Sequence, residues 1–247
     1  MRRAGKPKAI RPARKSKEDL TQKAYNALCK MLLFNEIAVG QKIHYLDLAE
    51  KLRVSPTPVI QALKWLQFQG LVRHENNRGF YLEDISLDEV EQLYQMRSAV
   101  ELTLLNRTMN RLDNAGLALL RASLEAFLQA TQTKFSKQIL VKDMEFHLTL
   151  ASLSGGRTGC LILQHIFDLL YLKYRTDLLY LNPSYEVHKK VFDCIVARDF
   201  EGARDTLSRH LSKVTIDVLA LIRLNQEEKK TLELDNVQRL KIGGSTR

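Results

Sequence analysis

The chain has 247 residues, 45% of them hydrophobic, and a net charge of +10. This length suits one large or two ordinary domains with hydrophobic cores. No apolar run approaches the roughly 20 residues of a membrane helix, and the N-terminus is charged where a signal peptide is apolar. We therefore expect a cytoplasmic protein with no membrane partner. Cys29, Cys160 and Cys194 are odd in number and lack CxxC spacing, which favours reduced structural thiols over disulfides or a thiolate metal site.

The positive charge is concentrated at the N-terminus. Residues 1–84 hold sixteen lysines and arginines against eight acidic residues, and half of these cations lie in residues 1–17. That first segment has two prolines and almost no large apolar residue, which predicts a disordered basic arm that either tracks DNA or is a solvated leader. The asymmetry predicts a polyanion-binding domain over residues 18–84, followed by a nearly neutral domain over residues 85–225.

The basic domain begins with a pattern of three helices. Residues 18–34 predict an amphipathic helix with a buried stripe, and residues 46–53 predict a second, shorter helix. A third helix begins only a few residues later, after Ser55. Two helices this close together have the spacing of a helix-turn-helix, and Ala49 is small enough to let them approach closely.

The third helix lies in the stretch from Val54 to Leu71. Ser55 can cap it through the side-chain hydroxyl, Pro56 suits the first helical position, and Gly70 ends it. One face is apolar and the other carries hydrogen-bonding groups, Gln61, Lys64 and Gln67. A short helix of this kind in a basic segment is a candidate for insertion into a DNA groove, and a solvated surface helix is the alternative.

A hairpin is predicted directly after this helix. Leu71-Val72-Arg73 and Phe80-Tyr81-Leu82 have the composition of strands, and the residues between them, Asn76 to Gly79, have that of a turn. The hairpin completes a winged helix-turn-helix. Arg78 and Gly79 at its tip suit contact with a phosphate or the minor groove, because arginine supplies charge and glycine allows close backbone approach.

Residues 43–82 resemble the GntR-type winged helix. They contain, in order, a Leu-Ala pair, a Ser-x-Thr-Pro-Val-x-x-Ala-Leu run, a Gly-Leu-Val and an Arg-Gly wing. The resemblance implies binding to a double-stranded DNA operator. The family usually has arginine where this chain has Leu46, Pro56 and Ile60, so the usual family operator is not expected. The remaining candidates for DNA contact are Ser55, Thr57, Gln61, Lys64, Arg73, Arg78 and Gly79.

From Ser86 onward the pattern is helical. Six amphipathic helices joined by short loops predict an antiparallel bundle, so the fold class is mainly α, an N-terminal winged helix-turn-helix followed by an all-α six-helix bundle. Ser86 with Glu89 forms a capping box for the first of these helices, and Asp113 or Asn114 is expected to cap the second. The fourth is expected over about residues 158–181 and the sixth from Asp199 to about Leu224. Residues 226–247 are highly charged and are expected to form a fraying tail or a short extra helix.

A possible metal site lies in the bundle. Asp143 and His147 are four residues apart on one helix, so their side chains share a face, and His188 and His210 lie among apolar residues on two later helices. Burying three imidazoles and a carboxylate is costly unless they share a partner such as a divalent cation. The alternative is ordinary half-buried or surface histidines. The other three histidines are expected to be structural or solvated: His44, His74 and His165.

The bundle also resembles the FCD domain of the FadR branch of the same family. Metal-binding members use Asp-x-x-x-His on one helix and single histidines on two later helices, which implies that Asp143, His147, His188 and His210 bind Zn²⁺, Ni²⁺ or Mn²⁺. The resemblance also implies a small organic acid as effector. Arg97 occupies the position of a family arginine that often faces the pocket; its alternative is a surface pair with Glu101.

These features predict a ligand-responsive homodimeric transcription regulator that binds a pseudo-palindromic operator, most simply as a repressor. One alternative is a metal-bound sensor whose DNA contacts are weakened or altered. Another is a metal-dependent hydrolase or lyase with Glu145 or Glu186 as base. Both glutamates are adjacent to ligand positions on their helices and therefore point elsewhere, and no nucleophile motif is present, so we expect no enzyme activity and no catalytic residues.

Overall fold

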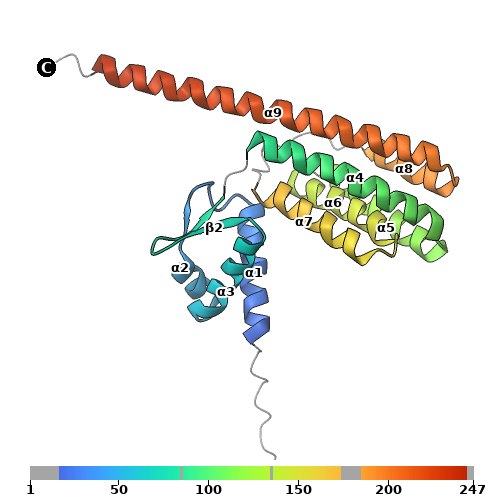
Figure 1. Ribbon diagram of the computed structural model, residues 1–247, viewed down its shortest axis with the longest axis horizontal. Coiled ribbons are helices and arrows are strands. Elements are labelled where there is room, and N and C mark those ends of the chain that lie inside the picture. The colour runs from blue at the N-terminus through green and yellow to red at the C-terminus, as the bar shows by residue number, and fades with distance from the viewer. Residues whose placement is uncertain (1–16, 84–85, 134–135, 174–184, 244–247) are drawn as a thin grey trace, which may run out of the picture.

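The computed structural model describes residues 17–83, 86–133, 136–173 and 185–243, so the predicted basic arm lies outside the described residues except for Lys17. Figure 1 shows a small N-terminal unit beside one end of an elongated helical bundle. No helix in the described part of the chain combines the length and apolarity needed to cross a membrane. The mainly α fold with an N-terminal winged helix-turn-helix is as predicted.

The N-terminal unit has the element order of a winged helix-turn-helix. Its helices and strands are α1 (Lys17–Leu33), β1 (Lys42–Ile43), α2 (Tyr45–Leu52), α3 (Pro56–Phe68), β2 (Val72–Glu75) and β3 (Gly79–Leu82). The described residues form one antiparallel sheet in the order β1-β3-β2. The sequence did not reveal β1, because two residues are too few to show the alternation that marks a strand.

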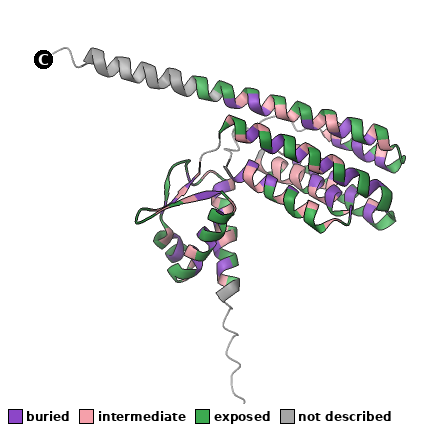
Figure 2. Ribbon diagram, in the orientation of Figure 1, coloured by how far each residue is buried: buried purple, intermediate pink, exposed green. Residues whose placement is uncertain are grey.

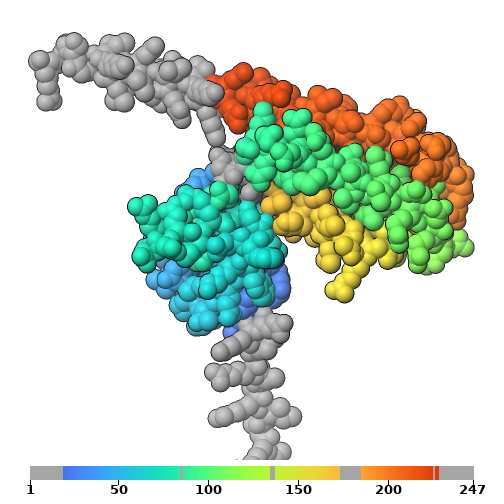
Figure 3. Space-filling view, in the orientation of Figure 1, coloured from blue at the N-terminus to red at the C-terminus, as the bar shows by residue number. Residues whose placement is uncertain are grey.

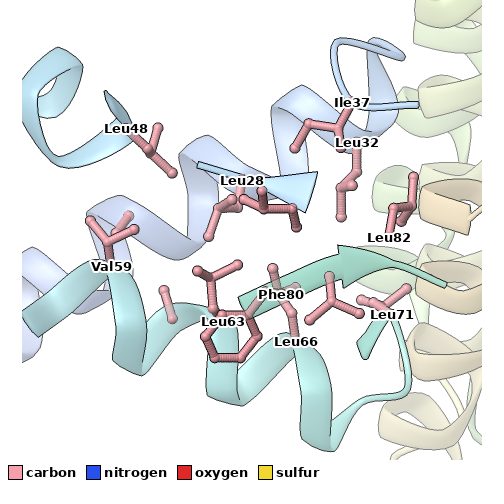
Figure 4. Close-up of a cluster of buried hydrophobic side chains, with 14 of the residues drawn as sticks. Leu28, Leu32, Ile37, Leu48, Val59, Leu63, Leu66, Leu71, Phe80 and Leu82 are labelled. Atoms are coloured by element: carbon pink, nitrogen blue, oxygen red, sulfur yellow. The ribbon is translucent and has the colours of Figure 1, made fainter. Parts of the chain in front are cut away.

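One hydrophobic core holds this unit together. In Figure 4, Leu28 of α1, Leu63 and Leu66 of α3, and Phe80 of β3 converge between the helices and the sheet. Leu28, Leu63 and Leu66 are fully buried. Burying one such side chain contributes about 1.5–3 kcal/mol. The apolar stripe that the sequence predicts for α3 is therefore the face that fixes this helix to the domain, which leaves its polar face outward.

The start of α3 differs from the prediction in one respect. Ser55 occupies the N-cap position with an extended backbone, but its side chain makes no capping hydrogen bond. A capping hydroxyl accepts from the N–H of the second or third helical residue. Pro58 is the third helical residue and has no N–H, so half of the usual partners are missing. The Ser55 hydroxyl is left exposed.

The helices of the C-terminal unit are α4 (Leu87–Arg111), α5 (Asn114–Thr131), α6 (Ser136–Ser152), α7 (Arg157–Lys173), α8 (Tyr185–Val196) and α9 (Phe200–Gly243). Helix α4 packs against α6, α7 and α9, while α5 packs against α6 and α8. The predicted caps are present, since Ser86 accepts from the Glu89 N–H at 3.1 Å and Asp113 accepts from the Gly116 N–H at 2.8 Å. The predicted continuation of the fourth helix beyond Lys173 falls outside the described residues.

Helix α9 is longer than predicted. It does not end near Leu224 but continues to Gly243, so residues 226–243 extend α9 and form neither a fraying tail nor a separate short helix. The physical reason is the absence of glycine and proline between Leu224 and Gly243. Charge alone does not end a helix, because oppositely charged side chains three or four residues apart stabilise one. Figure 1 shows α9 running along α4 and continuing past the end of the bundle.

The two units meet through α1 and α7, which pack against each other. Leu172, near the end of α7, is 9% exposed and belongs to the hydrophobic core of the N-terminal unit. Figure 3 shows the two units in contact at the end of the bundle. The bundle helices in Figure 2 alternate buried and exposed residues along their length, as amphipathic helices do.

Candidate metal centre and nucleic-acid interface

Four side chains from three helices converge inside the bundle. Asp143 and His147 come from α6, His188 from α8 and His210 from α9, and one ligand atom from each lies within 4.8 Å of the others. A metal–ligand bond is about 2.0–2.2 Å, so donors on opposite sides of one ion are separated by about twice that length. The four donors therefore fit around a single ion with only small side-chain movements.

The donors are close to one another, and two of them are shielded from solvent. His188 Nε2 lies 3.0 Å from Asp143 Oδ1 and 3.1 Å from His147 Nε2. His147 and His188 are each 1% exposed. Three aromatic rings line the cluster, because Phe146 and Phe127 lie edge-on to His188 and Phe167 is tilted against His147. Apolar rings around the cluster lower the local dielectric constant and strengthen electrostatic interactions with any bound cation.

Glu101 of α4 fixes the orientation of His147. Its Oε2 atom lies 2.6 Å from His147 Nδ1. Because an ionised carboxylate only accepts hydrogen bonds, Nδ1 must carry a proton, and Nε2 is the atom that faces Asp143 and His188. Burial opposes ionisation of Glu101, but the charges of His147 and Arg97 outweigh it and lower the pKa of Glu101 to about 2.

The protonation states suit metal binding. Burial, reinforced by the charges of His147 and His188, lowers the pKa of His210 to about 3, so this imidazole is neutral at pH 7. Burial opposes ionisation of Asp143, but the hydrogen bond and charge of His188 hold its pKa well below the usual range. A neutral imidazole and an ionised carboxylate are the forms that bind a cation.

Arg97 is next to this cluster and is almost completely buried, with 1% of its surface exposed. Its Nε donates to Glu101 Oε1 at 2.6 Å and its Nη1 donates to the Tyr171 hydroxyl at 3.3 Å. The guanidinium carbon lies 4.8 Å from the centre of the Phe167 ring. Nη2 has no hydrogen-bond partner among the described residues. The pair with Glu101 therefore exists, but inside the bundle rather than at the surface.

The residues predicted to contact DNA lie on α3 and on the wing. Thr57, Gln61 and Lys64 are exposed on α3, and Ser55 is exposed at its N-cap. The Gln61 side chain also accepts a hydrogen bond from the Thr21 hydroxyl at 3.0 Å, so one of its polar atoms has an internal partner.

The wing carries charge of both signs. Arg73 and Arg78 both pair with Glu75, the second at 3.6 Å, and Arg73 lies over the Tyr81 ring. Gly79 at the wing has a φ of +113°, a conformation that favours glycine. Glu75 therefore compensates part of the positive charge that the sequence assigned to this hairpin.

Two further cations lie near this surface that sequence reasoning did not single out. A Cβ atom on Gly79 would lie 3.1 Å from Lys42 Cε, so the Lys42 side chain lies against the wing. Arg53 ends α2 in the left-handed conformation, with a φ of 56°, and is exposed. Lys42 belongs to the unpredicted strand β1, and pairing of Lys42 with Tyr81 is what brings it to the wing.

Comparison with known proteins agrees with both units. Residues 20–82 match the family described as bacterial regulatory proteins, gntR family, and residues 92–213 match the FCD domain. The chain belongs to the GntR family. The HTH-type transcriptional regulator YdhC of Bacillus subtilis is 24% identical over 193 residues, covering 76% of this chain and 86% of YdhC. The HTH-type transcriptional repressor RspR of Escherichia coli is 19% identical over 213 residues, covering 85% of this chain and 93% of RspR.

A solved GntR-like fold is also similar. The structure of Escherichia coli McbR/YncC has a TM-score of 0.71 and 21% identity, and the match covers 84% of this chain and 98% of that one. The family and its relatives are transcriptional regulators rather than enzymes. Glu145 and Glu186, the bases of the hydrolase alternative, are both exposed, as their helix positions predicted.

Within the GntR domain, the three positions that depart from the family arginines differ in environment. Leu46 is 58% exposed on α2, Pro56 is exposed at the start of α3, and Ile60 is partly buried. None of these side chains can donate a hydrogen bond, so none can make the contacts that an arginine could make at the same position.

The histidines assigned no ligand role are exposed, namely His44, His74 and His165. Sequence reasoning missed Tyr171 and the role of Glu101. Glu101 is four residues after Arg97, a spacing that is visible in the sequence, but its contact with His147 joins residues 46 positions apart.

Proposed function

We propose that this GntR-family regulator is a homodimeric, cytoplasmic repressor whose operator binding is modulated by a small organic acid held at a divalent metal in the FCD domain. The observation that carries the proposal is the convergence of Asp143, His147, His188 and His210 within 4.8 Å. Beside them is a buried arginine with one nitrogen that has no hydrogen-bond partner in the described part of the chain. The name of RspR, a transcriptional repressor, supports the choice of repression.

The donor set limits the metal. Three imidazole nitrogens and one carboxylate oxygen suit Zn²⁺, Ni²⁺ or Mn²⁺ and contain no soft thiolate. Four protein ligands leave an open position only when the metal has a coordination number above four. The metal would then act as a Lewis acid that attracts an oxygen of the effector carboxylate or a water molecule.

Arg97 supports an acid as the effector. Its Nη2 is buried without a partner among the described residues, and a buried unpaired donor costs about 1–3 kcal/mol. A carboxylate oxygen that accepts from Nη2 would recover this cost. An acid placed between Arg97 and the metal would therefore be held at both ends by opposite charge, and its binding would change the packing of α4 and α7.

A direct experiment removes ligands and measures metal. Replacing both His188 and His210 by alanine should abolish stoichiometric metal and remove the rise in melting temperature that metal produces in the parent protein. His165→Ala is the matched control, because this histidine is exposed and lies outside the cluster. Unchanged metal content in the double variant would refute the proposed ligand set.

The DNA-binding part has its own test. Operator affinity should fall steeply as salt rises, and Lys64→Ala should lower the slope of log affinity against log salt by about 1 if this exposed lysine contacts a phosphate. Arg223→Ala, an exposed cation on α9, should leave the slope unchanged. A complex that does not respond to salt contradicts the proposal.

A second candidate, a metal-bound sensor with weakened or altered DNA specificity, is favoured by the apolar residues Leu46, Pro56 and Ile60. A bidentate arginine contact discriminates between bases by about 1–3 kcal/mol, so the loss of such contacts relaxes specificity without removing electrostatic binding. Selection of bound fragments from a random DNA pool separates the two candidates. An enriched palindromic motif supports the regulator, and enrichment of no motif supports the sensor.

A further inference from the structure

One face of helix α7 contacts Arg97 and the proposed metal ligand His147. Phe167 and Tyr171 are four residues apart and therefore share this face. The Phe167 ring centre lies 6.3 Å from that of His147 and 4.8 Å from the guanidinium carbon of Arg97. The Tyr171 hydroxyl accepts from Arg97 Nη1 at 3.3 Å. A movement of Arg97 or His147 therefore acts directly on side chains of α7.

The opposite face of α7 enters the DNA-binding domain. Leu172 belongs to the core of that domain, and Leu169 packs against the cores of both domains. Leu169 Cδ2 lies 3.9 Å from the place where Gly70 would carry a Cβ atom, which is the exit of α3. Burial raises the pKa of Cys29 of α1, and the charge of Asp168 raises it further. Asp168 is the residue between Phe167 and Leu169 on α7.

Helix α7 is connected in this way to both α1 and α3, the helices that support the DNA-facing surface. Helix α1 packs against α7 and also against α3. The Tyr25 hydroxyl of α1 donates to Gln69 Oε1 at 3.0 Å, immediately before Gly70. A shift of Leu169 would therefore displace residues of α1 and of the end of α3 together.

We propose that α7 is the element through which occupancy of the metal site changes the DNA-binding domain, with Leu169 as the contact that transmits the change. This inference rests on the proposed function. A packed interior responds to a moved side chain by moving its neighbours, because it has few voids that absorb the displacement. Phe167 and Leu169 belong to one rigid helix, so a movement forced on one is imposed on the other. Coupling requires that metal binding favours one of two positions of this helix.

The experiment uses the full chain with Zn²⁺ as the probe and measures amide hydrogen exchange, segment by segment, with and without metal. In the parent protein, Zn²⁺ should slow exchange in the bundle and also in α1 and around Gly70. Leu169→Ala should keep zinc affinity and protection within the bundle, but reduce the zinc-dependent protection of α1 by about fivefold or more. Leu161→Ala is the matched control, because Leu161 is on α7 but 59% exposed, and it should behave as the parent.

The outcomes separate this inference from the function on which it rests. Zinc protection confined to the bundle of the parent protein, or full protection of α1 in Leu169→Ala, overturns the role of α7 while leaving the metal site intact. If Leu169→Ala does not fold, Leu169→Val tests the same contact with a smaller change.

Failure of Zn²⁺ to bind refutes the proposed function by itself. In that case Phe167→Leu tests α7 without metal, because it alters only the cluster-facing side. Faster exchange in α1 of this variant supports the transmitting role, and unchanged exchange overturns it.

Discussion

Replacing Glu101 by glutamine removes the carboxylate that pairs with both Arg97 Nε and His147 Nδ1. The Glu101 side chain is 3% exposed and that of Arg97 is 1% exposed, so this ion pair is fully buried. Removing one partner of a buried pair costs about 3–5 kcal/mol, because the remaining charge is left without compensation. That is a large part of a total stability of about 5–15 kcal/mol. Loss of the partner that orients His147 should also weaken metal binding by about 10–100-fold.

Two measurements separate these effects. Chemical denaturation of the metal-free protein gives the free energy of unfolding, and calorimetric titration with Zn²⁺ gives the metal affinity. The matched control is Glu145→Gln on α6, whose partner Lys142 is at 2.6 Å but whose own side chain is 48% exposed. An exposed ion pair contributes less than about 1 kcal/mol, so this control should change neither quantity appreciably.

A double variant tests the reasoning more strictly. Replacing Arg97 by methionine together with Glu101 by leucine removes both charges and keeps apolar volume, so most of the lost stability should return. Metal affinity should stay low, because His147 still lacks the acceptor that holds its Nδ1 proton. Equal stability of Glu101→Gln and Glu145→Gln, or parental metal affinity in the double variant, would contradict these roles of Glu101.

Three further predictions address the core, the domain junction and the wing. Leu63→Ala should lower the free energy of unfolding, measured by chemical denaturation, by about 2–5 kcal/mol, because Leu63 is fully buried. Leu46→Ala, at a site 58% exposed, should lower it by no more than about 0.5 kcal/mol. Similar losses in the two variants would contradict the described core. Burial raises the pKa of Asp168, so the ionised carboxylate destabilises the folded protein above that raised pKa. Asp168→Asn should therefore stabilise the protein at pH 7, and the gain should vanish as the pH falls below the ordinary aspartate pKa. A gain that does not depend on pH would refute this cause. Glu75→Gln should release Arg78 and tighten DNA binding at low salt, measured by fluorescence anisotropy; weaker binding would show that Glu75 orients the wing instead.

Local patterns were sufficient for most of the fold. The spacing of apolar residues predicted the helices, since a buried face must recur every three or four residues whatever it packs against. Caps at Ser86 and Asp113 were visible because the hydroxyl or carboxylate and its backbone partner are three residues apart. The same local rule was wrong at Ser55, because Pro58 at the third helical position has no N–H to donate to the Ser55 hydroxyl.

The metal cluster was only partly a local property. Asp143 and His147 share a helical face by spacing alone, but nothing in their spacing shows that His188 and His210 meet them. The resemblance to the FCD domain supplied that link, and the fold brings the four donors within 4.8 Å. Glu101 and Tyr171 were beyond the reach of a pattern, because their contacts with His147 and Arg97 join helices far apart in the sequence.

Sequence patterns predicted the order of helices, the winged helix-turn-helix, the basic character of the N-terminal third and the two donors on α6. These follow from spacing, composition and charge, which are properties of neighbouring residues. Two contacts became visible only in the folded chain: Glu101 buries its charge between Arg97 and His147, and Leu169 packs against both cores. Packing of separate helices selects such contacts, and a helix pattern specifies which face is buried without specifying what covers it.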